Sequence, residues 1–381
     1  MDPATQQILD DSRIRSVTAT ISDLSDSKVV LGSHQSRPGK DDFTSLAPHA
    51  AVLQRYSNSE IIFVHDILGR EAKAAMEKLK EGQVLVLENL RFWAEENVEA
   101  SPEKQARTIF VRTLAPIFEA YVNDAFATSH RSHPSLVGLP QVLPSCAGRL
   151  MIRELDAARH ILERPTRPFV LVLGGAKVED KMLVIERMIQ LGRTDKILVG
   201  GMLAKLFLKA KGYKLAENEI QDLANPSEWI SKARSILRKH GTRIVLPEDV
   251  ALEWKGERKE IPITDHNGER PFWDIGLATI KKYSRILQDA GTVVAVGPLG
   301  VFERNGFDTG TSEVLLRIAG LRAFTVIGGG HLYGLAGILG VDNQFSHVST
   351  AGGAFLSLLA GDTLPAVKVL ERVQDPRQGK S

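Results

Sequence analysis

The sequence predicts an α/β fold with two lobes, each a Rossmann-like parallel β-sheet flanked by helices, joined by a long hinge helix. Short β-branched runs alternate with helical patterns along the chain, which is typical of βαβ units. The length of 381 residues also exceeds what one hydrophobic core usually supports. We expect a first lobe over residues 1–143, an inter-domain helix over 144–163 and a second lobe over 164–354, with about 355–381 packing back on the first lobe.

The first lobe alternates apolar strand candidates with helical crossovers. The strand candidates are residues 28–34, 60–66, 82–89 and 120–126. Residues 43–56 and 102–117 have helical patterns. The 144–163 helix is expected to begin at the capping residue Ser145 and to end before two prolines.

The second lobe repeats this plan. Its strand candidates are residues 168–175, 196–201, 243–250, 291–298 and 323–330. A hydrophilic stretch at 253–270 is expected to be a surface excursion. Most of these strands run directly into Gly, His or Asp, and ligands of open α/β sheets bind at the carboxyl ends of the strands.

Composition argues against several classes of protein. With 48 Lys plus Arg against 46 Asp plus Glu, the net charge of +2 gives no bulk reason to bind nucleic acid or an anionic membrane. Cys146 is the single cysteine, which excludes a disulfide framework and fits a reducing compartment; we expect it to be a small buried apolar residue. The start, MDPATQQILDDSR, does not resemble a signal peptide, and glycines interrupt the uncharged run 323–341. We therefore expect a cytoplasmic protein.

A first constellation of candidate functional residues is basic and lies wholly in the first lobe. Its members follow strands or open a helix, and they are Arg13, His34, Arg37, Arg91, His130, Arg131 and His133. Guanidinium groups match phosphate and carboxylate geometry, so this set could converge on a small polyanion. A zinc pair of His130 with His133 is possible, but the sequence offers no evident third ligand.

A second constellation is glycine-rich and lies in the second lobe. The run LVLGGAKVEDK reads as a strand, a turn at Gly174 and Gly175, and a helix whose Lys177 and Lys181 share one face. Backbone N–H groups, a helix dipole and two ammonium groups would together cradle a phosphate. Further glycine turns follow in VGGMLAK, IGGGHLYG and STAGGAF, and Glu303 could accept from ribose hydroxyls. There is no P-loop, GxGxxG fingerprint, GxSxG elbow or HExxH motif, and no general acid–base pair is evident.

These motifs together resemble a known family. The chain is similar to phosphoglycerate kinases in the sequences and the order of seven segments: SHQSRPG, ENLRFWAEE, YVNDAFATSHRSHPS, LGGAKVEDK, GPLGVFE, IGGG and FSHVSTAGGAFLSLLAGDTLP. The segments DDSRIR, SHQSRPGKDDF and GGGHLYG look most like those of the archaeal members of this family. The resemblance implies reversible phosphoryl transfer between ATP and the carboxylate of 3-phosphoglycerate, giving ADP and 1,3-bisphosphoglycerate, in glycolysis or gluconeogenesis.

The resemblance also implies roles for individual residues. Substrate-binding positions are matched by Arg13, His34, Arg37, Arg91, His130 and Arg131. Catalytic positions are matched by Arg13, Lys177 and Lys181. Nucleotide-binding positions are matched by Gly175, Lys177, Lys181, Gly201, Gly297, Glu303, Gly329, Gly330, Gly352 and Gly353. Mg²⁺ is implied as Mg-ATP or Mg-ADP with no metal ligand assigned in the chain, the lobes are implied to close over the substrates, and a monomer or homodimer is expected.

The sequence departs from the family pattern in three places. The family normally opens with a strand reading like V-R-V-D-F-N, and this sequence begins in a stretch resembling the one just after it, so we expect that strand and its two ligands to be missing. Val296 stands where the family has Asn, and His331 where many members have a metal-associated Asp. An alternative is therefore a catalytically impaired nucleotide-binding relative. A nicotinamide dehydrogenase is disfavoured because no GxGxxG with a downstream acid is found.

Overall fold

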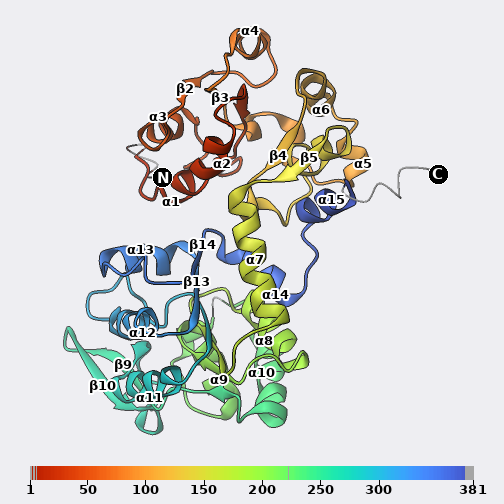
Figure 1. The fold of residues 1–381 in the computed structure, drawn as a ribbon. Helices are drawn as coiled ribbons and strands as arrows, with labels where there is room; N and C mark the ends of the chain where they lie inside the picture. The colour runs from red at the N-terminus through yellow and green to blue at the C-terminus, as the bar shows by residue number, and fades with distance from the viewer. Residues whose placement is uncertain (1, 3–4, 6, 222, 374–381) are drawn as a thin grey trace. The chain divides into compact units, whose positions relative to one another are not determined.

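In the computed structural model, which describes residues 2, 5, 7–221 and 223–373, the chain divides into two compact units. Unit 1 contains residues 1–155 and 363–381, and unit 2 contains residues 156–362. The end of the expected C-terminal tail, residues 374–381, lies outside the described residues. Figure 1 follows the chain through both units, whose positions relative to one another are not determined.

Unit 1 is built on short parallel strands. The strands are β1 Val29–Leu31, β2 Glu60–Phe63, β3 Gln83–Val86, β4 Tyr121–Asn123 and β5 Ser145–Ala147. In the described residues they form a sheet in the order β1-β3-β2 and a separate parallel pair, β4-β5. The helices are α1 Ser12–Ser16, α2 Thr18–Asp23, α3 Ala47–Tyr56, α4 Arg70–Lys78, α5 Pro102–Gln105, α6 Ile109–Leu114 and α15 Pro365–Val373.

Two apolar clusters cover the β1-β3-β2 sheet. Leu85 and Leu87 pack with α4 and α6, whereas Val84 and Val86 pack with α2 and α3. Alternate residues of β3 thus face opposite layers, as the period of a strand requires. The C-terminal helix α15 belongs to unit 1, where Ala366 and Val369 pack against residues 136–137.

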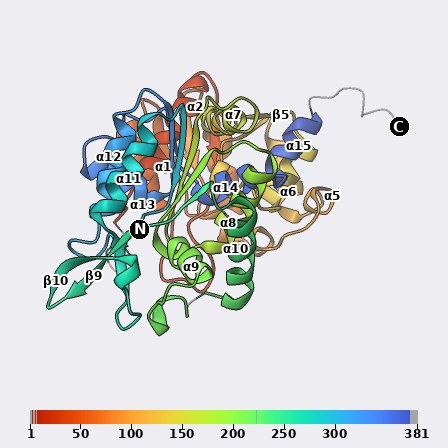
Figure 2. The same ribbon diagram turned by 90° about the horizontal axis from the view of Figure 1, so that it is seen from below.

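Unit 2 contains a parallel sheet and a smaller antiparallel one. Its strands are β6 Phe169–Leu173, β7 Lys196–Val199, β8 Ile244–Val245, β9 Asp249–Trp254, β10 Glu257–Pro262, β11 Phe272–Ile275, β12 Thr292–Val296, β13 Phe324–Gly328 and β14 His347–Ser349. Among described residues the parallel sheet has the order β14-β13-β12-β6-β7-β8. The hydrophilic stretch 253–270 contains β10 and the turn that joins it to β9, in the antiparallel sheet β10-β9-β11. The β9–β10 hairpin projects from unit 2 in Figure 2.

Helices cover both faces of the parallel sheet. They are α8 Val178–Gln190, α9 Gly201–Lys211, α10 Pro226–His240, α11 Leu277–Gln288, α12 Thr309–Ala319, α13 Gly330–Ile338 and α14 Gly352–Ala360. Figure 2 shows α11, α12 and α13 on one side of the sheet and α8, α9, α10 and α14 on the other. Because both faces are covered, every residue of β6 and β12 is buried. The predicted α/β class is confirmed.

The expected helix over 144–163 is wrong at its start. Helix α7 spans Arg149–Glu163, and Ser145 lies in β5 instead of capping it. Groups distant in sequence satisfy the first turn of α7: the Thr20 hydroxyl accepts from the Arg149 N–H at 2.8 Å, and Asp124 accepts from the Met151 N–H at 2.9 Å. The boundary between the two units falls inside α7, after Leu155.

Two further expectations are corrected. Cys146 is exposed, because it is the middle residue of β5 and lies on the opposite face of the strand from the half-buried Ser145 and Ala147. The helix expected over 102–117 is broken into α5, α6 and the 3₁₀ turn Ala115–Ile117. Thr108 restarts the helix, since its hydroxyl accepts from the Val111 N–H at 3.3 Å.

No single helix in the described part of the chain is long and apolar enough to cross a membrane. One pair, Gly352–Ala360 with Pro365–Glu371, meets the length and composition criteria together but is bent by 66°.

Candidate active site

Unit 1 gathers charged side chains in the loops that follow β1, β3 and β4. His34 and Arg37 follow β1, Arg91 lies in the 3₁₀ turn Leu90–Phe92 after β3, and Arg131 follows β4. Burial lowers the pKa of the Arg91 guanidinium, and the positive charges of Arg131 and Arg37 lower it further, while Glu96 opposes the shift. These loops therefore bring three guanidinium groups within electrostatic reach of one another. That they form a polyanion site remains a prediction.

The arginines of this cluster hold donors that lack a protein acceptor. Arg91 is only 7% exposed, and its Nη1 donates to the Ser36 carbonyl. In the described residues, the buried Nε groups of Arg91 and Arg131 have no hydrogen-bond partner. Because a buried unsatisfied donor is costly, an anion with several acceptor oxygens would stabilise this arrangement.

A buried carboxylate, which the sequence reasoning missed, organises the histidines. Glu96 is fully buried; its Oε1 lies 2.8 Å from His34 Nε2, and its Oε2 accepts from the Ser135 N–H at 3.0 Å. Ligand atoms of His34, Glu96 and His133 lie within 4.8 Å of one another. The expected pairing of His130 with His133 is therefore wrong. The possible ligands beside His133 are His34 and Glu96, whereas His130 is exposed and does not belong to this group.

Burial controls the protonation of His133. Its side chain is 3% exposed, and burial lowers the pKa of His133 to about 4, with Glu96 opposing and electrostatic interaction with His34, Arg91 and Arg131 assisting. His133 is therefore neutral at pH 7. It supplies no positive charge to an anion at that pH.

The loop that carries His34 and Arg37 is held by two polar residues at the end of β3. Asn89, fully buried, accepts from the Gln35 N–H at 3.2 Å and donates to the Gln35 and Thr44 carbonyls. Glu88 accepts from the Leu46 N–H at 2.9 Å and from its own neighbour Asn89. The sequence showed these residues only as part of a strand end, because their role depends on a loop more than 40 positions away.

Arg13, Arg37 and His130 are exposed. Arg13 lies on the short helix α1, and His130 directly precedes Arg131. Their assignment as substrate ligands remains a prediction.

In unit 2, the loops after three adjacent strands pack backbone against backbone. Strands β12, β6 and β7 are neighbours, and the Gly175 N–H donates to the Pro298 carbonyl at 2.6 Å, while the Gly201 N–H donates to the Leu299 carbonyl at 2.7 Å. Gly201 and Gly297 have φ of +53° and +81°, and a Cβ at either would lie 2.7 Å or less from the Gly174–Gly175 backbone. Only glycine permits this approach, which brings the backbones of the three loops together at the carboxyl edge of the sheet.

The two lysines of the first glycine turn occupy different environments. Lys177 is exposed and is the N-cap residue of α8, not a member of the helix face as expected. Lys181 is 4% exposed, and its Nζ donates to the Lys177 carbonyl at 2.8 Å. Burial lowers the pKa of Lys181 to about 8, Asp180 opposing and Lys177 assisting. A buried ammonium next to a helix N-terminus favours an anionic ligand, which would restore its lost solvation.

The other predicted glycines meet at the carboxyl ends of β13 and β14. Gly329 and Gly330 begin α13, and Gly352 and Gly353 begin α14. A Cβ on Gly352 would lie 3.0 Å from the Gly329 backbone, whereas one on Gly330 or Gly353 would meet nothing within 4 Å. Two helix N-termini thus adjoin, with N–H groups that no side chain at these four positions covers.

Two charged residues of the antiparallel sheet, Asp274 and Arg258, hold the segment that follows Glu303. Asp274, fully buried, accepts from the Gly310 N–H at 2.7 Å and from Arg258 Nη1 at 2.9 Å. Arg258 also donates to the Gly306 carbonyl at 2.8 Å. Glu303 itself is exposed, and its assignment to the ribose remains a prediction.

Comparison with known proteins decides the family. The family model described as phosphoglycerate kinase matches residues 1–362. The chain belongs to the phosphoglycerate kinase family. It is therefore a kinase that transfers a phosphoryl group, as expected from the sequence; the impaired alternative gains no support.

Relatives and solved structures agree with this assignment. The chain is 41% identical over 378 residues to the phosphoglycerate kinase of Methanothermus fervidus, covering 98% of this chain and 92% of that one. It is 44% identical over 367 residues to phosphoglycerate kinase 2 of Methanosarcina acetivorans, covering 96% and 88%. The crystal structure of the Pyrococcus horikoshii kinase matches with a TM-score of 0.90 at 39% identity, covering 98% and 93%. The Coxiella burnetii kinase matches with a TM-score of 0.79 at 32% identity over the same shares.

The structure also locates the two internal departures from the family pattern. Val296 is the last residue of β12 and is 4% exposed, so an apolar residue fits its environment. His331 follows Gly330 in the first turn of α13, and its ring lies 5.1 Å from the ring of Phe302. A histidine is a poor match for Mg²⁺, which prefers oxygen ligands.

Proposed function

We propose that unit 1 binds 3-phosphoglycerate through its basic cluster and that unit 2 binds the nucleotide at its glycine loops. The substrate residues are Arg13, His34, Arg37, Arg91, His130 and Arg131. The nucleotide residues are Gly175, Lys177, Lys181, Gly201, Gly297, Glu303, Gly329, Gly330, Gly352 and Gly353. Arg13, Lys177 and Lys181 act on the transferring phosphoryl group.

The observation that carries this division is the different chemistry of the two units. Unit 1 offers guanidinium forks, including the buried Nε donors of Arg91 and Arg131, which suit a small anion with phosphate and carboxylate groups. Unit 2 offers helix N-termini, bare backbone N–H groups and the buried Lys181, which suit a chain of phosphates.

The reaction requires no general base. The acceptor carboxylate has a pKa near 4 and is ionised at neutral pH, so no proton has to be removed before it attacks. Catalysis then depends on in-line positioning and on neutralising the charge spread over the transferring oxygens. Lysine and arginine side chains and helix N-termini supply that neutralisation without changing their protonation state.

Mg²⁺ is proposed to arrive with the nucleotide phosphates, as Mg-ATP or Mg-ADP. Because His331 stands in the turn after Gly330, that turn offers no carboxylate ligand of its own. We further propose a cytoplasmic location, a monomer or homodimer, and small-molecule partners in place of nucleic acid or membrane, which accords with the net charge of +2.

The test is a coupled assay in which 1,3-bisphosphoglycerate formed from Mg-ATP and 3-phosphoglycerate is reduced enzymatically. Arg131→Ala is expected to raise the KM for 3-phosphoglycerate by tenfold or more and to leave nucleotide binding unchanged. Lys177→Ala is expected to lower kcat by about 10²-fold. A matched control is Lys239→Ala, which removes an exposed lysine of unit 2 outside these loops. If Arg131→Ala affected only the nucleotide KM, the division of substrates between the units would be wrong.

A further inference from the structure

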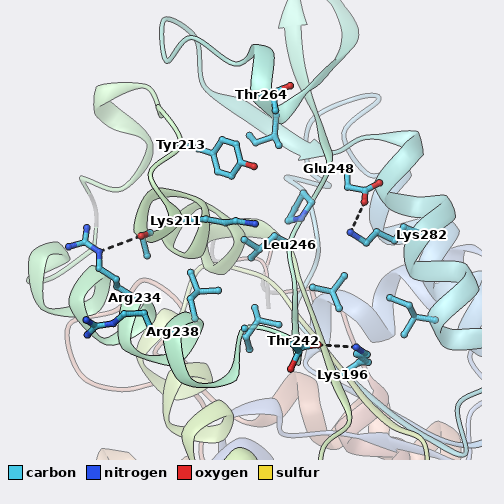
Figure 3. Close-up of a pocket in the computed structure, with 18 residues that line it drawn as sticks. Lys196, Lys211, Tyr213, Arg234, Arg238, Thr242, Leu246, Glu248, Thr264 and Lys282 are labelled. Atoms are coloured by element: carbon cyan, nitrogen blue, oxygen red, sulfur yellow. Dashed lines mark hydrogen bonds and ion pairs between the residues drawn. The ribbon is translucent and has the colours of Figure 1, made fainter.

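Unit 2 contains a cavity of about 940 Å³ beside β8, the edge strand of its parallel sheet. Its walls come from the ends of α9 and α10, from α11 and from residues 242–248. Figure 3 shows Arg234 and Arg238 on one side, Glu248 and Lys282 on the other, and Lys211 extending toward Leu246 between them. The volume lies in the range of small-molecule sites.

The lining is far more basic than the chain as a whole. Five lysine or arginine side chains face one glutamate, in a protein whose net charge is +2. The glutamate is already paired, since Glu248 Oε1 lies 2.7 Å from Lys282 Nζ. Within the described residues, the remaining four cations, Lys196, Lys211, Arg234 and Arg238, form no ion pair with a carboxylate.

Backbone carbonyl groups and helix dipoles compensate the positive charge of these four side chains only in part. Lys196 Nζ donates to the Thr242 carbonyl at 2.9 Å, and Arg234 Nε donates to the Ala210 carbonyl at 3.4 Å. Lys211 and Arg238 lie in the last turns of α9 and α10, where helix dipoles stabilise cations. However, Arg234 and Arg238 are four residues apart on one helix, a spacing at which like charges repel.

The floor of the cavity is apolar. Ile244 and Val245 are buried residues of β8, and Ile263 is 4% exposed. Leu246 and Tyr213 pack against the cluster that contains Ile263 and Phe272. An apolar floor under a cationic rim is complementary to a molecule with an apolar body and negatively charged groups.

The cavity is separate from the residues assigned to the nucleotide. None of its lining residues is among the glycines and lysines of the loops after β6, β7, β12, β13 and β14. Its lining extends from Lys196 and Thr242, at the amino ends of β7 and β8, past the carboxyl end of β8 to Glu248.

We propose that this cavity is a second ligand site, which binds an amphipathic organic anion: an aromatic or aliphatic body on the β8 floor, with a phosphate or sulfonate group held by Lys211 and Arg238. The charged group supplies the counter-ion that the described residues lack, and the apolar body covers the floor. An inorganic anion would pair with the cations of the rim but would leave the apolar floor uncovered.

The experiment is a fluorescence titration of the full chain with 1-anilinonaphthalene-8-sulfonate, whose aryl body and sulfonate match the two halves of the cavity. Saturating Mg-ADP is present throughout, so that binding at the proposed nucleotide site does not contribute. Lys211→Ala/Arg238→Ala is expected to weaken the remaining binding by about tenfold or more. Lys209→Ala/Lys239→Ala removes two charges from the last turns of the same helices but outside the lining, and is expected to leave binding unchanged.

A second experiment measures what the charged group and the apolar body each contribute to binding. Uncharged N-phenyl-1-naphthylamine and inorganic phosphate are each expected to bind at least tenfold more weakly than the sulfonate. The proposal is overturned if the sulfonate does not bind in the presence of Mg-ADP, if both double variants weaken its binding equally, or if the uncharged probe binds as tightly as the sulfonate.

Discussion

Lys181→Met is expected to make the protein more stable while removing its activity. Burial lowers the pKa of Lys181 from 10.5 to about 8 in the folded chain. That difference corresponds to about 3 kcal/mol against folding when the lysine is charged. Methionine fills a similar volume without a charge and loses one hydrogen bond to the Lys177 carbonyl, worth about 1 kcal/mol. The net expectation is a gain of about 2 kcal/mol in the free energy of unfolding at pH 7.

The pH dependence of this gain follows from the direction of the shift. Between pH 8 and 10.5 the unfolded chain binds the Lys181 proton more tightly than the folded one, so the stability of the parent protein rises with pH over that interval. The variant lacks this titration. Its advantage is therefore full below pH 8 and disappears by about pH 10.5.

Urea unfolding of the parent and the variant at several pH values measures this difference. Because a chain with two units need not unfold in one step, the transition assigned to unit 2 is compared. Lys177→Met is the matched control: Lys177 is exposed in the same turn and contributes least to the shift of Lys181, so its replacement should impair catalysis and change stability much less. A destabilised Lys181→Met variant, or a gain that does not vary with pH, would refute the reasoning that burial depresses this pKa.

Two further predictions address the glycine loops and the buried carboxylate of unit 1. Gly201→Ala is expected to cost about 2 kcal/mol or more in stability and to raise the nucleotide KM, because its Cβ would meet the Gly175 backbone at 2.7 Å. Gly337→Ala, in open space on α13, should instead be neutral or stabilising by up to about 1 kcal/mol in the same unfolding experiment. Glu96→Gln is expected to raise the KM for 3-phosphoglycerate about tenfold without changing the nucleotide KM, since the acceptor that orients His34 is weakened. Glu99→Gln, at a carboxylate 59% exposed, is the control; equal effects of both changes in steady-state kinetics would exclude a positioning role for Glu96.

Much of the fold could be predicted because parallel strands have a local pattern. The apolar runs that become β6, β7, β12 and β13 end in glycine turns, and the structure places those turns at one edge of a single sheet. Strand boundaries were less predictable. The run 243–250 splits at Pro247 into β8 and β9, which join different sheets.

The start of α7 shows where local signals fail. Ser145 has a strong capping propensity, yet the residues that satisfy the first turn are Thr20 and Asp124, which only the folded chain brings near Arg149. The same holds for Cys146, whose exposure depends on which face of β5 the rest of unit 1 covers. A short sequence window does not contain these partners.

The sequence by itself determined the family, the α/β class and the types of residue available for binding anions, because these depend on motifs and on local periodicity. Only the tertiary structure decided which groups share an environment. It buried Lys181 and His133 and lowered their pKa values, placed Glu96 beside His34, and left Lys211 and Arg238 beside a cavity without a described carboxylate partner. The physical reason is that burial and electrostatic interaction depend on distances between residues that lie far apart in the chain.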